Sequence, residues 1–368
     1  MPENESWKDI ARRKQEQRDA AIPASWRLQS KPGANRVKVL AVPRECGILT
    51  KEEIAITEDY DACGLLDELA SGRLKSIDVT TAICKRAAIA HQLSNCLTEI
   101  FFDSALERAR ELDAHFQKTG KPKGPLHGLP VSLKDSFRVI GHDASIGIAS
   151  LCFKPCKVNS TLVDMLLDAG AVLYCKTNVP QTLMALDSHN NIFGRTLNPA
   201  NLRLTAGGSS GGEGALVALR GSILGVGTDV GGSIRIPAMC NGLYGIKPSH
   251  GRVPYAGQEN GTIAGAEVLG IRASAGPIAH SVRDCELLMR VVGDGRAWNW
   301  DPEVVPQSWK LQAPLHAQQD SQKPVVVGVV RTEGVTTPLP PIARFMDEVA
   351  NTLRKTSSTP ASRWLIST

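Results

Sequence analysis

Two glycine-rich loops that carry serine lie close together in this sequence, and one lysine lies in an apolar segment upstream of them. Residues 207–214 read Gly-Gly-Ser-Ser-Gly-Gly-Glu-Gly, and residues 229–235 read Asp-Val-Gly-Gly-Ser-Ile-Arg. The lysine, Lys134, lies in Val-Ser-Leu-Lys-Asp-Ser at 131–136. Glycine allows a substrate to approach the main chain closely, so a serine in such a loop can face a carbonyl while neighbouring N–H groups point at its oxygen. The pattern predicts a hydrolase in which lysine activates one serine through a second serine.

Lys134 itself has two interpretations. Its neighbours Val131, Leu133 and Phe137 are apolar, and a lone lysine in such a segment usually extends its amine to solvent. If the side chain is buried instead, desolvation disfavours the ammonium and lowers its pKa, which makes a neutral amine available as a base. The two serine loops downstream favour this second interpretation.

The first loop is compatible with other functions when it is taken alone, including a flexible linker. A phosphate cradle would end in Gly-Lys-Ser/Thr, which this loop lacks. Gly-x-Ser-x-Gly occurs twice, centred on Ser209 and on Ser210. However, an α/β-hydrolase elbow follows a strong strand, and residues 198–203 are turn-like, which argues against that class.

The second loop is predicted to join a strand at 223–226 to a helix that begins near 236–238. Such a turn exposes consecutive N–H groups, which can bind the oxyanion formed when Ser233 attacks a carbonyl. The residues that supply these groups are Val230, Gly231, Gly232 and Ser233. A histidine base is not favoured, because only His127 lies in a glycine setting and that segment is predicted to be a turn.

The composition is that of a globular enzyme of one or two domains, with 368 residues, 42% hydrophobic and 21% charged. The net charge of +5 is spread out, and no basic run is dense enough to predict a nucleic-acid partner. The first residues are polar and no long apolar stretch occurs, so neither a secretory signal nor a membrane span is predicted and a cytoplasmic location is expected. The nine scattered cysteines predict free thiols rather than a metal site.

Helices and strands are predicted to alternate in the second part of the chain. Before Pro125, helical patterns cover 6–20, 76–93 and 103–117, and 22–50 is irregular. After it, the predicted strands are 129–133, 171–175, 223–226 and 325–330, and the predicted helices are 160–167, 213–219, one from 281 and 342–354. Ser160 and Ser281 are predicted to cap their helices. The alternation predicts a layered α/β domain whose sheet is buried on both faces.

Together these motifs resemble those of the amidase signature family, and within it the fungal acetamidase-like amidases. The matching segments are 124–137, 207–214, 227–237, 242–248 and 275–278, and the N-terminal arm with Gly-Ile-Leu-Thr at 47–50 resembles the fungal subgroup. The similarity runs from about residue 5 to 355. It implies an amidase-signature fold, a mixed, twisted β-sheet flanked by helices on both faces. The domains implied are a helical and irregular arm at 1–58, the amidase signature domain at 59–355, and a disordered tail outside the family at 356–368.

The resemblance also implies a role for each residue of the motifs. Lys134 would be the base, Ser209 the relay serine that follows a cis peptide bond, and Ser233 the nucleophile that becomes the acyl-enzyme. The oxyanion hole would consist of backbone groups of Val230, Gly231, Gly232 and Ser233, with Leu183 lining the acyl pocket and Ser210, Asp229 and Arg235 orienting the relay. The implied activity is hydrolysis of a small carboxylic amide to an acid and ammonia or an amine, without a metal or an organic cofactor.

The sequence departs from the family at its C-terminal end. Family members continue considerably further, whereas residues 356–368 do not continue the family helix at 349–355. The chain is therefore expected to be truncated, with part of the sheet and of the pocket wall absent. Apolar surface exposed on a cut sheet would favour association, so a homodimer is one expected form. Two alternatives stay open: an inactive homologue that acts only by binding, and an amidotransferase subunit, against which the N-terminal arm argues.

Overall fold

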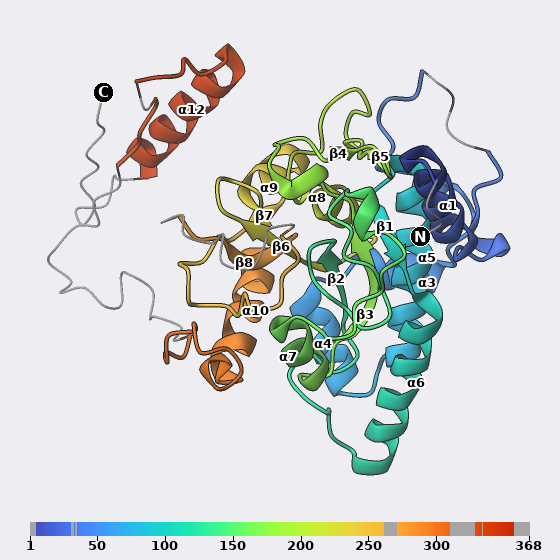
Figure 1. Ribbon diagram of the computed structural model, residues 1–368. Coiled ribbons are helices and arrows are strands. Elements are labelled where there is room, and N and C mark those ends of the chain that lie inside the picture. Colours follow the sequence, from blue (N-terminus) through green and yellow to red (C-terminus); the bar gives the residue numbers. More distant parts are fainter. Residues whose placement is uncertain are drawn as a thin grey trace, which may run out of the picture. The chain divides into compact units, whose positions relative to one another are not determined.

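The structure is a computed structural model that describes residues 5–30, 33, 35–260, 271–309, 328–332 and 334–356. It forms two compact units, Met1–Trp309 and Lys310–Thr368 (Figure 1). In the second unit, α12 (Pro340–Thr356) contains the helix predicted at 342–354. Residues 328–330 of the predicted last strand are not in a strand. Thr356, the first residue of the predicted tail at 356–368, belongs to α12, and the rest of that tail and residues 325–327 of the predicted strand lie outside the described residues.

The first unit is built on a six-stranded mixed sheet in the order β1-β3-β2-β6-β8-β7 (Figure 1). Its strands are β1 (Leu97–Ile100), β2 (Pro130–Lys134), β3 (Val172–Thr177), β6 (Leu224–Asp229), β7 (Tyr244–Gly245) and β8 (Ser274–Ala279). Strand β2 runs parallel to β3 and β6, and the outer pairs are antiparallel. The predicted strands at 129–133, 171–175 and 223–226 correspond to β2, β3 and β6, and the predicted mixed sheet is confirmed.

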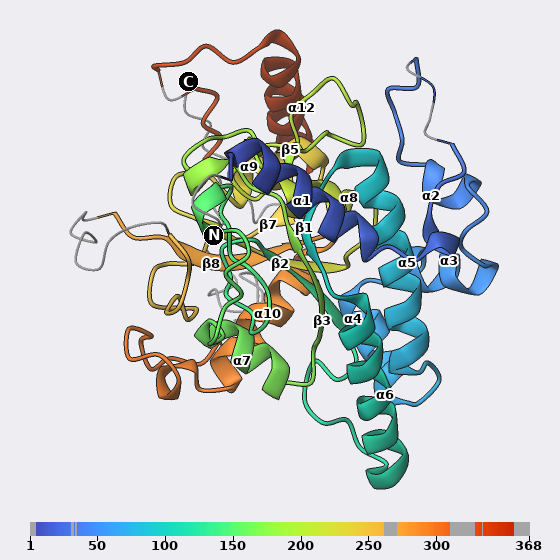
Figure 2. The ribbon, with the colours of Figure 1, turned by 45° about the vertical axis from the view of Figure 1, so that its right-hand side comes forward.

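Helices cover both faces of the sheet because its two parallel crossovers run in opposite directions. From β2 the chain passes through α7 (Thr161–Asp168) to β3, which lies on one side of β2. From β3 it passes through α8 (Gly211–Ala218) to β6, which lies on the other side of β2. Right-handed crossovers then place α7 and α8 on opposite faces (Figures 1 and 2). The layered α/β architecture follows from this connectivity.

The other elements of the first unit largely match the sequence patterns. Helix α1 (Trp7–Ala20) begins after Ser6, whose side chain accepts the N–H of Asp9, and α10 (Val282–Asp294) begins after Ser281, which accepts the N–H of Asp284. The remaining helices are α2 (Val42–Glu45), α3 (Lys51–Glu58), α4 (Ala62–Ala70), α5 (Ser76–Ser94), α6 (Phe102–Thr119) and α9 (Arg235–Asn241), with a two-stranded sheet of β4 (His189–Asn190) and β5 (Gly194–Arg195).

Two features of the first unit differ from the sequence-based expectation. Ser160 directly precedes α7, but its side chain does not cap the helix as predicted. Its hydroxyl donates instead to the carbonyl oxygen of Gly257 at 2.7 Å. Strand β8 was not predicted, because Pro277 and Gly276 within it are residues that normally weaken a strand. It forms because β6 supplies a full antiparallel ladder along its length.

Helix α8 lies against the backbone of neighbouring elements, and this fixes the loop that precedes it. It packs on β2, β3 and β6, and its residues from Gly211 to Val217 are buried. A Cβ added at Gly212 would lie 2.3 Å from the backbone nitrogen of Asn178 and 2.7 Å from the carbonyl oxygen of Cys96. Only glycine allows so close an approach, so the position of the loop at 207–210 is set by main-chain packing.

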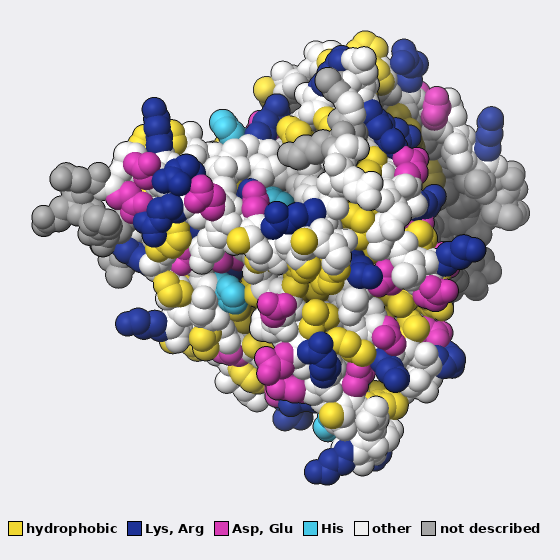
Figure 3. Space-filling model, turned by 90° about the vertical axis from the view of Figure 1, so that its right-hand side faces the viewer, with side chains coloured by type: hydrophobic (Ala, Val, Ile, Leu, Met, Phe, Trp, Pro, Cys, Tyr) yellow, Lys and Arg dark blue, Asp and Glu magenta, His cyan; other side chains and the backbone are white. Residues whose placement is uncertain are grey.

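Charged side chains of both signs are interspersed on the face that carries α6 (Figure 3).

Within the described ranges, each helix is too short or too polar to cross a bilayer.

Candidate active site

The three parallel strands of the sheet end side by side, at Lys134 in β2, Thr177 in β3 and Asp229 in β6. Since parallel strands share one carboxyl edge, these residues lie at the same edge of the sheet, which is where α/β proteins commonly bind ligands. Both serine loops also reach this edge, because the first precedes α8 and the second follows β6 directly. The fold thus brings together the lysine and the two loops that the sequence analysis singled out.

Lys134 is fully buried and its amine has three neighbouring oxygen atoms. Nζ lies 2.6 Å from Oγ of Ser209, 2.8 Å from Oγ1 of Thr228 and 3.2 Å from the carbonyl oxygen of Thr228. A neutral amine has two N–H groups and one lone pair. If the two N–H groups donate to Thr228, the lone pair faces the hydroxyl of Ser209. This arrangement suits an amine that accepts a proton from that hydroxyl.

The surroundings of Lys134 favour the neutral amine near pH 7. Burial lowers its pKa to about 7, although the negative charges of Asp229 and Glu213 act in the opposite direction. The burial predicted from the apolar neighbours is therefore present, and the surface interpretation of this lysine is wrong. A lysine with a pKa near neutrality is a suitable general base, because both of its protonation states are populated at neutral pH.

Ser209 lies in a loop that is fixed on both sides of the serine. The peptide bond between Gly208 and Ser209 is cis, and Ser209 is buried. Ser188 holds the flanking residues, since its hydroxyl donates to the carbonyl oxygen of Gly207 at 3.0 Å and accepts the N–H of Gly211 at 2.9 Å. Gly207 has a φ of 81°, and a side chain there would meet the backbone of Pro237. The serine that contacts Lys134 is thus held by a buried hydrogen-bonded support.

The carboxylate of Asp229 organises the second loop. It accepts the N–H of Gly232 at 2.7 Å and that of Ile234 at 3.0 Å, and it pairs with the guanidinium of Arg235. Burial alone would raise the pKa of Asp229, but the hydrogen bonds from Arg235 and from the backbone outweigh it and hold the pKa at about 2. The carboxylate is therefore charged at neutral pH and bridges the turn around Ser233.

The two loops are also joined to each other. The N–H of Ser210 donates to the carbonyl oxygen of Ser233 at 3.2 Å, and the hydroxyl of Ser210 donates to the carbonyl oxygen of Thr228 at 3.4 Å. Ser209, Thr228 and Ser233 line one cavity of about 390 Å³. Ser209 therefore contacts Lys134 and lines the same cavity as Ser233, and Ser210 joins the two loops.

The walls of this cavity contain several of the other predicted residues. Leu183 lines it with a φ of 66°, next to Thr182 with a φ of 60°. Of the predicted oxyanion donors, Gly232 already donates its N–H to Asp229. Within the described part of the chain, the N–H groups of Val230, Gly231 and Ser233 have no protein acceptor. These three groups are thus available to a bound oxygen.

Sequence reasoning missed two contributors to this site. Thr228 holds the amine of Lys134, and Glu213 is a buried carboxyl whose charge acts on the same amine. A signal for Thr228 was present, since it lies between the predicted strand at 223–226 and Asp229. Glu213 gave no such signal, because an acidic residue in the first turn of a helix is ordinary on electrostatic grounds alone.

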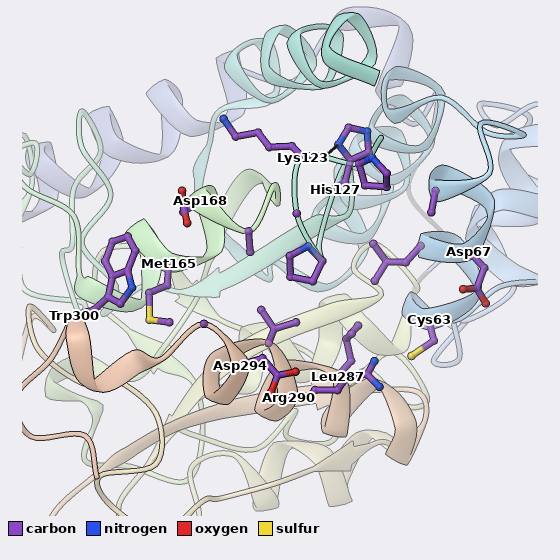
Figure 4. Close-up of a pocket in the computed structure, with 18 residues that line it drawn as sticks. Cys63, Asp67, Lys123, His127, Met165, Asp168, Leu287, Arg290, Asp294 and Trp300 are labelled. Atoms are coloured by element: carbon purple, nitrogen blue, oxygen red, sulfur yellow. Dashed lines mark hydrogen bonds between the residues drawn. The ribbon is translucent and has the colours of Figure 1, made fainter. Parts of the chain in front are cut away.

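A larger cavity of about 600 Å³ lies elsewhere in the first unit (Figure 4). It lies among α4, α7, α10 and the segment 122–127, and its walls include Asp67, Met165 and Arg290. The segment 122–127 and the end of α7 precede β2 and β3, so this cavity lies at the opposite edge of the sheet from Lys134. It contains neither serine loop, so its size alone does not make it the catalytic site.

His127 lies at the wall of the larger cavity, which contains neither serine loop. His127, the histidine in the glycine setting, accepts the backbone N–H of Lys123 through Nδ1 at 3.1 Å, which is a structural role in a turn. In the described ranges, no three His, Cys, Asp or Glu side chains form a cluster that could hold a metal ion.

Comparisons with known proteins identify the family of this chain. A family model described as Amidase matches residues 78–364. The chain is 48% identical over 309 residues to the putative amidase kk1C of Curvularia clavata, covering 83% of this chain and 57% of that protein. It is 46% identical over 357 residues to an acetamidase of Aspergillus oryzae, covering 97% of this chain and 64% of that protein. The chain thus spans less than two thirds of the length of these relatives.

Solved structures give the same result for the fold. A fatty acid amide hydrolase superposes with a TM-score of 0.89 at 34% identity, covering 99% of this chain and 63% of that one. The native peptide amidase from Stenotrophomonas maltophilia superposes with a TM-score of 0.64 at 26% identity, covering 84% of this chain and 61% of that one.

Proposed function

Because this chain belongs to the amidase family, we propose that it hydrolyses a small carboxylic amide to the acid and ammonia or an amine through Lys134, Ser209 and Ser233. The observation that carries the proposal is the contact between the buried amine of Lys134 and Oγ of Ser209 at 2.6 Å, at the wall of the cavity that Ser233 also lines. The activity is proposed for the chain as it stands, although it spans only part of the length of its relatives.

In the first step, neutral Lys134 takes the hydroxyl proton of Ser209, and Ser209 takes that of Ser233. Oγ of Ser233 then forms a bond to the amide carbon, and the negative charge that develops on the carbonyl oxygen is bound by backbone N–H groups of the loop at 230–233. The C–N bond breaks as the proton returns through Ser209 to the leaving nitrogen. The product of this step is an ester of Ser233 and free ammonia or amine.

In the second step, water replaces the amine. The same relay removes a proton from water as its oxygen attacks the ester carbon, and the proton returns to Oγ of Ser233 as the carboxylic acid leaves. The role of Asp229 and Arg235 in both steps is to hold the loop, and that of Ser210 is to keep the two loops at a fixed spacing.

The cavity supports an uncharged substrate. Its described walls have no charged side chain, and the apolar contacts come from Leu183, Met184 and Val230. A charged acyl group would lose its hydration there without gaining a partner, whereas a short apolar acyl chain would bury its surface favourably. We therefore infer a neutral acyl group. A cytoplasmic location and a homodimer remain predictions of the same proposal.

A fluorophosphonate probe tests the proposal together with hydrolysis of a series of short aliphatic amides. The expected result is covalent labelling at Ser233, shown by peptide mass spectrometry, and ammonia release that Ser233→Ala and Lys134→Ala each reduce by about 10³-fold or more. Ser222→Ala is a matched control, because Ser222 is buried nearby but does not line the cavity. If the folded wild type shows no labelling and no hydrolysis, the proposal is refuted and the alternative of an inactive homologue that acts by binding is left. Size-exclusion chromatography of the chain mixed with a full-length relative tests that alternative.

A further inference from the structure

A second buried titratable group lies beneath the site. Glu213 lies in the first turn of α8 and its carboxylate is fully buried. Oε2 accepts the hydroxyl of Ser132 at 2.5 Å, and Oε1 accepts the hydroxyl of Thr177 at 2.9 Å. No step of the proposed reaction uses this carboxylate. A buried acid without a basic hydrogen-bonding partner is costly, so its presence calls for a physical reason.

The strand register places this carboxylate beside Lys134. Ser132 and Lys134 are two residues apart on β2, so their side chains point to the same face of the sheet. Thr177 is the residue of β3 that stands opposite Lys134 in the register. The carboxylate of Glu213 contacts both Ser132 and Thr177, and therefore lies on the same face as the amine. Helix α8, which follows Ser209, thus carries a negative group to the face of the sheet on which the lysine side chain lies.

The third central strand leaves room for the carboxylate. Gly225 of β6 stands opposite Ser132 in the register. A Cβ added at Gly225 would lie 2.1 Å from Oε2 of Glu213, so the carboxylate occupies the space of the missing side chain. The carboxylate therefore sits in a cradle formed by β2, β3 and β6, and this cradle determines its position relative to Lys134.

Two negative groups act on Lys134, and the effect of Asp229 on β6 is larger than that of Glu213. Asp229 pairs with Arg235, which helps to keep its pKa at about 2, so its charge is constant near pH 7. The titratable groups that face Glu213 from other elements are Cys96, Tyr174 and Cys175, and burial raises the pKa of each above its ordinary value, so that all are neutral near pH 7. Burial also raises the pKa of Glu213, to about 7. Its charge is thus the variable one in the surroundings of Lys134.

We propose that Glu213 is a positioning residue that sets the basicity of Lys134, by holding a negative charge beside the amine from the cradle of Ser132, Thr177 and Gly225. The proposal rests on the proposed function for its kinetic consequence. With the carboxylate present, the amine keeps enough affinity for a proton to accept one from Ser209. Without the carboxylate, one of the charges that oppose the effect of burial is lost, so the pKa of Lys134 falls and its amine becomes a weaker base.

The variant Glu213→Gln tests this role, because it keeps the shape and removes the charge. The expected result is that the acidic limb of the kcat/KM profile moves to lower pH by at least about half a pH unit, while the plateau falls about threefold to tenfold. A purely structural role would lower the plateau and leave the limb in place. Ser222→Ala is the matched control, because Oγ of Ser222 lies 2.8 Å from Oγ of Ser132 and does not contact Glu213, and it should keep the wild-type limb.

Titration of the Lys134 side chain by ¹³C NMR separates this proposal from the proposed function. The signal is identified by its loss in Lys134→Met, and its midpoint should fall in Glu213→Gln. An unchanged midpoint would overturn the role of Glu213 even if the wild type hydrolyses amides. A lower midpoint in Glu213→Gln, together with a wild type that does not hydrolyse amides, would support the role of Glu213 and refute the proposed function. If Glu213→Gln does not fold, Ser132→Ala should give a smaller shift in the same direction, because it removes a donor that keeps the carboxylate charged, and no shift would again overturn the proposal.

Discussion

Asp229 and Arg235 form a two-pronged ion pair in which Nε of Arg235 donates to Oδ2 and Nη2 donates to Oδ1, each at 3.0 Å. The two side chains differ in environment, since the carboxylate is buried and 55% of the arginine side chain is exposed. The same carboxylate accepts the N–H groups of Gly232 and Ile234 on either side of Ser233. The pair therefore stabilises the turn that presents the proposed nucleophile.

We expect Asp229→Asn to lower kcat/KM by about 100-fold, because an amide provides one oxygen where the loop uses two. Arg235→Lys should lower it less, by about tenfold, since an ammonium does not reproduce the planar two-pronged contact. Steady-state kinetics on an amide substrate measures both changes. Equal activity of Asp229→Asn and the wild type would contradict the assigned role of the carboxylate in the loop.

The same aspartate predicts how stability depends on pH. Its pKa is about 2 in the folded protein and close to 3.8 in the unfolded chain. A carboxyl with a lowered folded pKa contributes stability that is full above the unfolded value and is lost as the pH falls towards the folded value. The difference in Tm between the wild type and Asp229→Asn should thus be greatest above pH 4 and shrink towards pH 2. A difference that stays constant over this range would argue against the lowered pKa.

Activity should rise with pH through about 7, the pKa of Lys134. The base must be neutral to accept a proton, so kcat/KM at pH 6 should be about one tenth of its plateau value. The pH dependence of kcat/KM reports the pKa values of groups in the free enzyme. Two amides with different leaving groups should therefore give the same acidic limb. A profile that is flat between pH 6 and pH 8 for both substrates is incompatible with Lys134 as the base.

The packing of α8 gives a prediction about stability. In Gly212→Ala the new methyl group would meet the backbone of Asn178 and Cys96, which cannot move away as a side chain would. We expect a loss of about 3 kcal/mol in the free energy of unfolding, measured by chemical denaturation. Gly231→Ala is the control, since a Cβ there has no heavy atom within 4 Å, and its unfolding midpoint should match that of the wild type.

The N-terminal helix is attached to the sheet through a buried cation. Nζ of Lys14 lies 2.5 Å from Oε1 of Glu99 and 2.7 Å from Oδ2 of Asp143, and all three side chains are buried. Lys14→Met should lower the free energy of unfolding by about 3–5 kcal/mol, because it removes the cation that two buried carboxylates share. The exposed Lys8 on the same helix serves as the comparison, and Lys8→Met should change stability by less than about 0.5 kcal/mol. Equal effects of the two substitutions would show that the buried network does not attach the arm.

The sequence by itself determined the elements and the residues that could do chemistry. Helical spacing at 76–93, glycine after the helix at 103–117, and the apolar runs of β2, β3 and β6 are local patterns, and local backbone preference plus burial was enough to predict them. Lys134 was likewise recognisable because it lies in an apolar segment, and Ser209 and Ser233 because they lie in glycine-rich loops.

Only the tertiary structure decided which of these groups meet and which charges act on them. The order of the strands puts β2 between β3 and β6, and this brings Lys134 to Thr228 and to Ser209 from segments far apart in the chain. Pairing of β8 with β6 overcame the poor strand preference of Pro277, since a ladder depends on its partner rather than on local sequence. The charge state of Lys134 depends on desolvation and on Glu213, and both are properties of the packed sheet that no spacing in the sequence reports.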